Sequence, residues 1–476
     1  MFKIKQLLLV ILLITLVACQ ANEQSVTEQN SMDEEETNQE SVDEKEINEP
    51  KKTSNAKIPD WSKDSVIYEV NVRQYTPEGT FEAFKNHLPR LQELGVDILW
   101  LMPIHPIAEE ERIGTLGSYY AVKDYKEVNP EFGTLEDFKD LVDTAHDMGM
   151  YVILDWVANH TGWDHVWIDE NPNWYEQNSN GEIIHPQEFN WTDVAQLNFE
   201  NDDMRQEMKD TMLFWVEEFD VDGFRADYAS GVPVDFWENI SAQLNEVKPV
   251  FMLAEDDRVF DLLNEAFFVN WGWGFHHIMN DIANGKRGAR AVKSHFAWAE
   301  SAYPEGTYPL QFLTNHDENS WQGIIDERLG EASEAMAALY FMVPGIPLIY
   351  SGQEAGDKKS LEFFEKDEID WSDMKMQDFY KELIQLKKEN QALWNGSAGG
   401  AINFLDTSDD RILAFIREKD DSKVIVIMNI SSEDIEGTVE IGLEGEFQLF
   451  QGDQSETLGE EETYQLGPWE YRIFYK

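Results

Sequence analysis

Cysteine and positive charge are both scarce in this chain of 476 residues. The one cysteine, Cys19, cannot form an internal disulfide, which excludes a fold held together by disulfides. Lys and Arg number 37 against 93 Asp and Glu, so the formal net charge is -56. We expect no nucleic acid partner, because a phosphate backbone repels so acidic a surface. A neutral substrate fits this charge better.

Long apolar segments are absent after the N-terminus. The apolar run at 7–17 follows Lys3 and Lys5, is too short for a stable transmembrane helix, and is typical of a signal peptide. It ends in LVAC at Cys19, which resembles the lipobox of bacterial lipoproteins, whose cysteine carries the lipid. We expect a lipoprotein signal peptide at 1–18, lipidation at Cys19, and an extracytoplasmic protein anchored to a bacterial membrane. An ordinary signal peptide with a chance cysteine is the alternative.

Large apolar side chains are nearly missing from residues 19–57, which are rich in Glu, Gln, Ser and Asn. Such a segment cannot bury enough apolar surface to offset the entropy of ordering its backbone. We therefore expect an acidic, flexible tether at 19–57 and a folded part that begins at Ile58.

Strand-like and helix-like patterns alternate from residue 58 to 394. Apolar segments such as 98–104 and 151–157 are each followed or preceded by amphipathic stretches such as 135–148. Apolar strands buried on both faces, each followed by a helix, indicate a parallel sheet. About eight such units predict a closed (β/α)8 TIM barrel, in which the sixth strand, within 266–273, is the least distinct.

Two segments depart from this alternation. Residues 161–201, after the third strand, are too long for an ordinary connection and predict a short inserted subdomain. Its Trp163, Trp167, Trp174 and Trp191 could stack on sugar rings, and we expect at most one or two of them to do so. From 395 to 476 the pattern becomes short alternating strands, which predicts a C-terminal antiparallel β-sandwich.

Four acidic motifs stand at the ends of apolar runs. They are DWVANH at 155–160, GFRAD at 223–227, LAED at 253–256 and TNHD at 314–317. A single Asp at a strand end is more often a helix cap than a catalyst. Carboxylates on several strands of one barrel instead meet at its C-terminal rim, where barrel enzymes place their chemistry. The motifs therefore predict a glycosidase pocket formed by Asp155, Asp227, Glu255 and Asp317.

On these four motifs, in this order, the chain resembles the α-amylase family, the family 13 glycoside hydrolases, over about residues 60–476. The resemblance implies that Asp227 is the nucleophile, Glu255 the general acid/base and Asp317 the transition-state stabiliser. It also implies roles in substrate binding for Tyr120, which would stack on the sugar, and for Asp155, His160, Arg225 and His316. A retaining glycosidase needs one ionised and one protonated carboxyl group, about 5–5.5 Å apart.

The resemblance also implies a calcium ligand at Asn159, but three other positions depart from the family pattern. Ser230 and Gly231 replace a Lys-His pair, and Gln196 replaces an aspartate that binds calcium in the family. Loss of a charged oxygen ligand weakens a site for a hard cation. No cofactor is therefore assigned with certainty, and a calcium ion at Asn159 is doubtful.

The leading interpretation is a retaining hydrolase of internal α-1,4-glucosidic bonds in starch or maltodextrins. Its expected partners are an α-glucan or maltooligosaccharide and, through the lipid anchor, a membrane. Cyclomaltodextrinase or neopullulanase, α-glucosidase and glucanotransferase activities remain open within the same family. From another class, a non-catalytic glucan-binding lipoprotein predicts lost carboxylates, whereas Asp227, Glu255 and Asp317 are all present.

Overall fold

The computed structural model describes residues 51–452 and 455–476. The signal peptide predicted at 1–18, the lipidation site at Cys19 and residues 20–50 of the predicted tether lie outside these residues. Within the described ranges, none of the helices is both long and apolar enough to cross a membrane.

The last residues of the segment predicted as a tether are bound to the folded unit, which spans Lys51–Lys476. The N–H of Ser54 donates to the carbonyl of Glu305 at 3.1 Å, and that of Asn55 to the carbonyl of Asn264 at 2.7 Å. Ser54 and Asn55, which the prediction assigned to the flexible tether, therefore belong to the folded unit.

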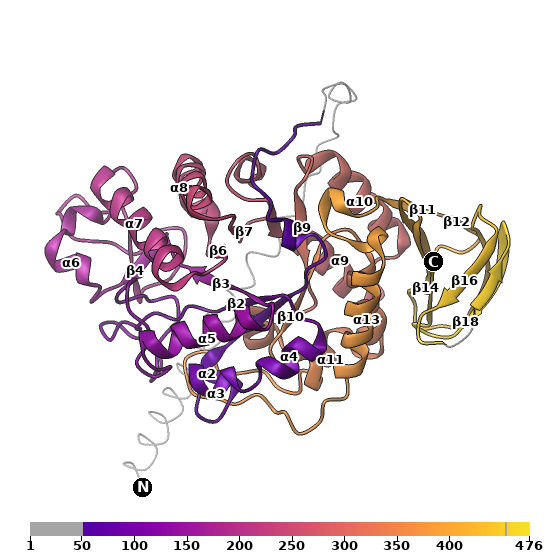
Figure 1. Ribbon diagram of the computed structural model, residues 1–476, viewed down its shortest axis with the longest axis horizontal. Coiled ribbons are helices and arrows are strands. Elements are labelled where there is room, and N and C mark those ends of the chain that lie inside the picture. Colours follow the sequence, from indigo (N-terminus) through magenta and orange to yellow (C-terminus); the bar gives the residue numbers. More distant parts are fainter. Residues whose placement is uncertain (1–50, 453–454) are drawn as a thin grey trace, which may run out of the picture. The chain divides into compact units, whose positions relative to one another are not determined.

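The folded unit is built around a barrel of parallel strands (Figure 1). In the part of the chain that the structure describes, eight strands close in the order β1-β10-β9-β8-β7-β6-β3-β2, which confirms the predicted barrel. The least distinct strand lies inside the predicted range 266–273. The strands are β1 (Ile67–Val70), β2 (Ile98–Leu101), β3 (Tyr151–Trp156), β6 (Gly223–Ala226), β7 (Phe251–Ala254), β8 (Val269–Trp271), β9 (Tyr308–Gln311) and β10 (Ile346–Tyr350).

Burial explains why these segments read as continuous apolar runs. Nearly every barrel residue is buried, because one face of each strand fills the barrel interior and the other packs against helices. Close packing also fixes Gly223 at the start of β6. Its φ is +151°, and a Cβ there would lie 2.0 Å from the carbonyl oxygen of Phe251 on β7.

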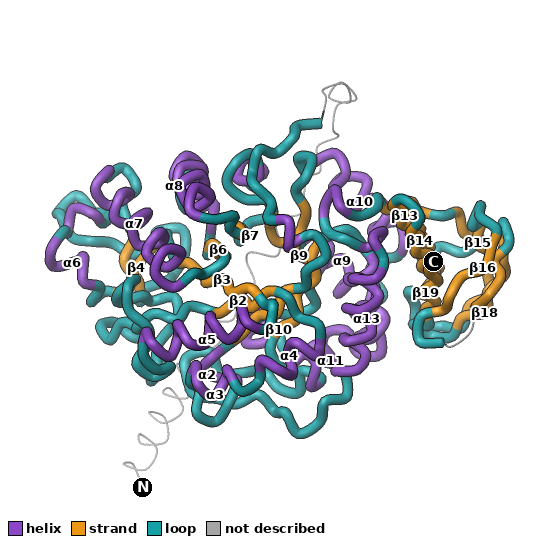
Figure 2. The backbone as a smooth tube through the Cα atoms, in the orientation of Figure 1, coloured by secondary structure: helices purple, strands orange, loops and turns teal. Residues whose placement is uncertain are grey.

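Helices lie around the barrel strands in the view of Figure 2. In α5, the buried residues Phe138, Leu141, Val142 and Ala145 form one face, and Thr134 with Asp137 forms a capping box at its start. The helices are α2 (Val72–Tyr75), α3 (Phe81–Lys85), α4 (Leu88–Leu94), α5 (Leu135–Asp147), α6 (Val166–Glu170), α7 (Asp202–Phe219), α8 (Val234–Val247), α9 (Trp273–Ala283), α10 (Ala289–Ala302), α11 (Ile325–Leu329), α12 (Ser333–Met342) and α13 (Gln377–Glu389).

The insertion after β3 contains a small antiparallel pair, β4 (His160–Gly162) and β5 (Val194–Gln196), together with α6. Residue His160 lies opposite Gln196 in this pair. His160, the last residue of the DWVANH motif, is thereby paired with the far end of the insertion.

The C-terminal segment forms two antiparallel sheets among its described residues, ordered β11-β13-β14-β19-β16-β17 and β12-β15-β18. Alternate residues such as Ile412, Ala414 and Ile425 form an apolar core between the sheets, and the opposite faces of β13 and β14 join the barrel core. The strands are β11 (Ile402–Phe404), β12 (Asp406–Thr407), β13 (Ile412–Lys419), β14 (Ser422–Asn429), β15 (Ile435–Glu440), β16 (Gly445–Leu449), β17 (Ser455–Leu458), β18 (Glu461–Leu466) and β19 (Tyr471–Tyr475).

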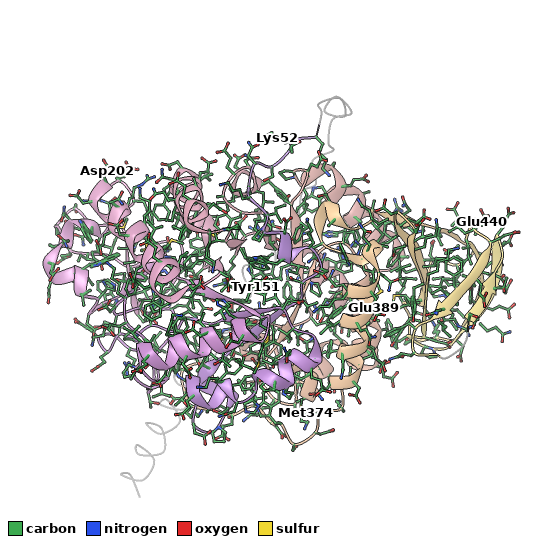
Figure 3. The ribbon with its side chains drawn as sticks, in the orientation of Figure 1. Lys52, Tyr151, Asp202, Met374, Glu389 and Glu440 are labelled. Atoms are coloured by element: carbon green, nitrogen blue, oxygen red, sulfur yellow. The ribbon has the colours of Figure 1, made fainter. Side chains whose placement is uncertain are left out.

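Acidic side chains cover the exterior. Asp202 on α7, Glu389 on α13 and Glu440 on β15 are exposed and are labelled in Figure 3. These carboxylates remain in water because burying a charged side chain without a partner is unfavourable.

Candidate active site

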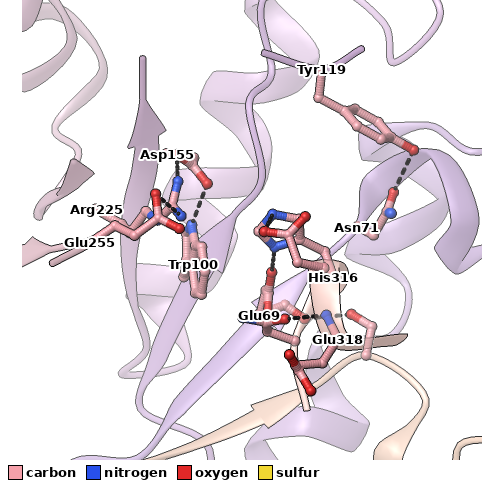
Figure 4. A network of polar contacts seen from close by, with 12 residues as sticks. Glu69, Asn71, Trp100, Tyr119, Asp155, Arg225, Glu255, His316 and Glu318 are labelled. Carbon is pink, nitrogen blue, oxygen red and sulfur yellow. Dashed lines mark hydrogen bonds and ion pairs between the residues drawn. The ribbon is translucent and has the colours of Figure 1, made fainter. Parts of the chain in front are cut away.

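The predicted site residues lie at one end of the barrel, because parallel strands place their carboxyl ends on the same rim. Asp155 belongs to β3 and Arg225 to β6. Asp227 follows β6 directly, Glu255 follows β7, and His316 with Asp317 follows β9. Residues far apart in the sequence therefore meet in one polar network (Figure 4).

Arg225 is the centre of this network and is 1% exposed. Its Nη1 lies 2.8 Å from Asp155 Oδ1 and 2.9 Å from Asp227 Oδ1, and its Nη2 lies 2.8 Å from Glu255 Oε2. Asp155 also accepts a hydrogen bond from Trp100 Nε1 on β2, at 3.2 Å. One guanidinium group thus holds three carboxyl groups in fixed positions, as its planar donors allow.

Glu255 presents one oxygen to the protein and leaves the other available. Its Oε2 accepts from Arg225 Nη2 and from the backbone N–H of Tyr228, the latter at 2.8 Å. Both partners are donors only, so the proton of neutral Glu255 resides on Oε1. Burial raises the pKa of Glu255 to about 7. The positive charge of Arg225 opposes this shift, and the negative charges of Asp227 and Asp317 add to it.

Burial raises the pKa of Asp227 to about 6, and the positive charge of Arg225 limits this rise. Asp227 and Arg225 lie on the same strand face, two residues apart, as the alternation of side chains along a strand requires. Close contact with Arg225 therefore favours the ionised form of Asp227 beside a more weakly acidic Glu255.

His316 connects two further groups. Its Nδ1 lies 2.6 Å from Glu69 Oε1, and its Nε2 lies 2.8 Å from the hydroxyl of Tyr120, which donates to Asp155 Oδ2 at 3.1 Å. Because the Tyr120 proton goes to Asp155, Tyr120 accepts from His316, and both ring nitrogens of His316 are donors. Burial lowers the pKa of His316, but Asp317 and Glu69 together outweigh it and raise this pKa to about 9.

Asp317 is the most open of the predicted catalytic residues, with 41% of its side chain exposed. Its Oδ2 lies 3.4 Å from His316 Nε2, and its Oδ1 accepts a hydrogen bond from Trp321 Nε1 at 3.2 Å. His316 and Trp321 thereby position the carboxylate of Asp317 at the exposed edge of the network.

His160 and Asn159 lie at the base of the insertion, where β4 begins. His160 Nδ1 lies 3.2 Å from Asn159 Nδ2, and burial lowers the pKa of His160 to about 3, so its ring is neutral. The ring centroid of Trp191 lies 5.5 Å from that of His160. Trp191 is thus the insertion tryptophan that lies beside a predicted substrate residue, whereas Trp167 is buried in the core.

Three residues of the network were not foreseen from the sequence: Glu69, Trp100 and Trp321. A charged residue inside the buried run Ile67–Val70 was a usable signal for Glu69, because buried carboxylates are rare without a partner. Trp321 follows Asp317 by four residues, a spacing that places two side chains on one side of a helical turn. Trp100, in an apolar strand, carried no signal that separates it from core.

Two family models match the chain. The model described as alpha amylase, catalytic domain, matches residues 35–189 and 187–251, and the maltogenic amylase C-terminal domain matches 402–473. The chain belongs to the α-amylase family. Asp155, Arg225 and Asp227 fall inside the first match, whereas Glu255 and Asp317 lie beyond it and join the network through the fold.

Relatives and solved structures within the α-amylase family extend over most of the chain. Alpha-amylase MalA of Haloarcula japonica is 29% identical over 79% of this chain, which spans 56% of that protein's length. Alpha-amylase 3 of Dictyoglomus thermophilum is 27% identical over 78% of this chain and 85% of its own. The noncanonic maltogenic alpha-amylase AmyB from Thermotoga neapolitana matches with a TM-score of 0.79 and 27% identity, covering 87% of this chain and 98% of AmyB.

The calcium ion implied by the α-amylase family resemblance does not fit the residues present. Gln196 Nε2 donates to Asn159 O at 2.9 Å, to Asn159 Oδ1 at 3.1 Å and to Leu197 O at 3.2 Å. An amide donor therefore occupies the point at which these oxygens converge, and the charged oxygen that a hard cation prefers is missing. Among the described residues, no group of three or more His, Cys, Asp or Glu side chains is arranged to hold a metal.

Proposed function

We propose that this α-amylase family member hydrolyses internal α-1,4-glucosidic bonds of starch or maltodextrins with retention of configuration. The observation that carries the proposal is the contact of one buried guanidinium group, Arg225, with Asp155, Asp227 and Glu255 at the rim of the barrel. This arrangement keeps one carboxylate ionised beside a carboxylic acid of raised pKa, as a retaining glycosidase requires.

The proposed reaction has two steps. In the first, a carboxylate oxygen of Asp227 attacks the anomeric carbon while Glu255 Oε1 gives its proton to the glycosidic oxygen, and the bond to the leaving sugar breaks. In the second, ionised Glu255 takes a proton from water as the water oxygen attacks the anomeric carbon and releases Asp227. The free sugar and both carboxyl groups are then in their starting states.

The remaining residues of the network hold the sugar at the cleavage point. Hydrogen-bond donors and acceptors for the hydroxyl groups of the sugar come from three residues: the imidazolium of His316, the neutral ring of His160 and the exposed carboxylate of Asp317. Tyr120 offers an aromatic ring next to His316, at a centroid distance of 5.6 Å. The same residues would also catalyse cyclomaltodextrinase, α-glucosidase and glucanotransferase reactions. Linkage and acceptor preference are therefore to be measured by product analysis.

The test compares a form beginning at Lys51 with its Asp227→Asn variant on starch, pullulan and cyclomaltodextrin. Rapid loss of iodine staining, with maltooligosaccharides whose first-formed anomer is α by proton NMR, is the expected result. Asp227→Asn should lower kcat at least 10³-fold, because it removes the nucleophile. The matched control is Asp210→Asn, an exposed aspartate on α7, which should leave kcat unchanged.

The outcomes separate the competing functions. Preferred turnover of cyclomaltodextrin or pullulan would favour the cyclomaltodextrinase or neopullulanase alternative. Products with inverted configuration would contradict the retaining mechanism, and binding without turnover of any of the three would favour a glucan-binding protein.

We also propose that Cys19 is lipidated and anchors the protein, on the extracytoplasmic side, to a bacterial membrane, with an α-glucan and no nucleic acid as its partner. The support is the LVAC motif after an apolar run and the acidic charge of the chain. Expression of the whole chain should place it in the detergent phase on phase separation, whereas Cys19→Ala should move it to the aqueous phase. Equal partitioning of the two would contradict the anchor.

A further inference from the structure

A row of aromatic rings leads away from the catalytic network. Tyr120 lies nearly parallel to Phe363, with centroids 6.3 Å apart and planes inclined by 10°. Phe363 contacts Trp321 at 5.5 Å, and Trp321 contacts Phe364 at 5.9 Å. We call these four residues the aromatic wall. They come from three different connections, after β2, after β9 and after β10, so the fold alone brings them together.

Trp321 is the open member of the aromatic wall. Its side chain is 52% exposed, while Trp100, Trp156 and Trp271 in the barrel are fully buried. A large aromatic ring left in water forgoes the free energy that its burial would supply. Phe363 and Phe364 pack against Trp321 and still leave half of it exposed, so the ring is supported beside the site.

The polar edge of the Trp321 indole contacts a predicted catalytic residue. Its Nε1–H donates to Asp317 Oδ1, and Asp317 in turn lies beside His316. Trp321 lies in the π-helical turn Glu318–Gln322 that begins directly after Asp317. A ligand that reaches Asp317 therefore also reaches the indole, which is held in orientation by this hydrogen bond.

We propose that Trp321 is a carbohydrate-binding residue, whose indole stacks on a glucose unit of an α-glucan next to the unit held by Asp317. This inference rests on the proposed function and adds a second binding position to it. The C–H face of a glucose ring is apolar and flat, so it covers an indole well, while its hydroxyl groups stay in water. A neutral sugar also avoids the repulsion that an anionic ligand meets at so acidic a protein.

The test uses Trp321→Ala and Trp321→Phe in the whole chain, with maltoheptaose as substrate. Trp298 is the matched control, because it is 47% exposed on α10 and contacts Phe260, His295 and Tyr303, none of which belongs to the network. Trp321→Ala should raise KM about 10-fold, whereas Trp321→Phe, which keeps a ring, should recover most of this loss. Trp298→Ala should leave KM unchanged.

Two results would overturn the proposal. One is a KM for Trp321→Ala within twofold of the unaltered protein. The other is an equal effect of Trp321→Ala and Trp321→Phe, especially a fall in kcat with unchanged KM, because the indole N–H would then act only by positioning Asp317. Calorimetric binding of maltoheptaose in the Asp227→Asn background gives the same comparison without turnover.

Measurements on maltoheptaose separate the proposed function from the role of Trp321. If the unaltered protein neither cleaves nor binds maltoheptaose, the proposed function is wrong. If it cleaves maltoheptaose and Trp321→Ala does so with the same KM, the proposed function stands and only the role of Trp321 is wrong.

Discussion

At the scale of single residues, the site depends on the balance of charge around Arg225. Its guanidinium is almost fully buried and is in contact with Asp155, Asp227 and Glu255. Removing a buried charge that is paired with several partners leaves those partners uncompensated, at a cost of about 3–5 kcal/mol. Arg225 is therefore needed for the position of the three carboxyl groups as well as for their ionisation.

Glu69 acts on the site through another residue. It is fully buried on β1, and one of its oxygens accepts a hydrogen bond from His316 Nδ1. Burial raises the pKa of Glu69, while the positive charge of His316 opposes this shift. The pair fixes the orientation of the His316 ring and supports its doubly protonated form, which places a cation beside Asp317.

The raised pKa of Glu255 predicts the alkaline limb of the pH profile. In the proposed mechanism Glu255 acts as an acid and must be protonated, so kcat/KM should fall as the pH rises through its pKa of about 7. The proposed nucleophile, Asp227, must be ionised, so activity should also fall as the pH drops through its raised pKa. Initial rates on maltoheptaose between pH 4 and pH 10 should therefore give a bell-shaped curve.

Glu255→Gln is the control for this assignment. It cannot release a proton, so the alkaline limb should disappear while kcat falls by about 10²–10⁴-fold. A profile of the unaltered protein that stays flat from pH 6 to pH 9 would show that Glu255 does not titrate in that range.

At the scale of secondary structure elements, local sequence explains where several elements begin and end. The segment from Phe81 to Leu94 forms two helices, α3 and α4, because Pro89 favours the first turn of a new helix and cannot continue the previous one. Helix α9 was not anticipated, since Gly272 and Gly274 at its start weaken the helical pattern. In α9, the burial of Phe275, Ile278 and Met279 outweighs this local preference.

Between β5 and β4, the Gln196 amide donates hydrogen bonds to Asn159, the residue at which the family resemblance implies a calcium ligand. We therefore expect the thermal midpoint of the unaltered protein to stay the same in EDTA and in millimolar CaCl₂, as measured by calorimetry. Gln196→Asp removes the amide donor and adds a carboxylate beside Asn159, so it should lower the midpoint without calcium. Saturating calcium at about 100 times its Kd should restore about 2.7 kcal/mol to that variant.

A fall of several degrees in the midpoint of the unaltered protein on chelation would contradict this account of Gln196. The isosteric variant Gln196→Glu serves as a second control. It retains side-chain length and loses the donor, so it should also be less stable than the unaltered protein when calcium is absent.

At the scale of the whole molecule, the net charge of -56 dominates. Like charges repel one another across the surface and destabilise the compact state. Salt shortens the range of this repulsion, from about 10 Å at 0.1 M to about 3 Å at 1 M. Ion pairs such as Arg411 with Glu433 are exposed and contribute little that salt could weaken.

We therefore expect the thermal midpoint at neutral pH to rise by a few degrees between 0.05 M and 1 M NaCl. Calorimetry with KCl at the same ionic strength is the control, and it should give the same rise because screening does not depend on the cation. A midpoint that falls with salt, or that responds to one salt alone, would show that surface repulsion is not the main effect.

The sequence by itself determined the barrel, the C-terminal sheets and the four carboxylates at the strand ends. These features depend on local patterns: apolar periodicity places strands, and the position of an acidic residue after an apolar run places it at the rim. Two side chains on one strand, such as Arg225 and Asp227, also have their relation fixed by spacing alone.

Only the tertiary structure decided how the side chains pair. Glu69 and His316 are 247 residues apart, and Gln196 reaches Asn159 only because the insertion folds back on β4. The aromatic wall joins Phe363 to Trp321 from separate connections. No sequence period relates such residues, since the geometry of the connections between barrel elements sets their distance, and that geometry exists only once the barrel has closed.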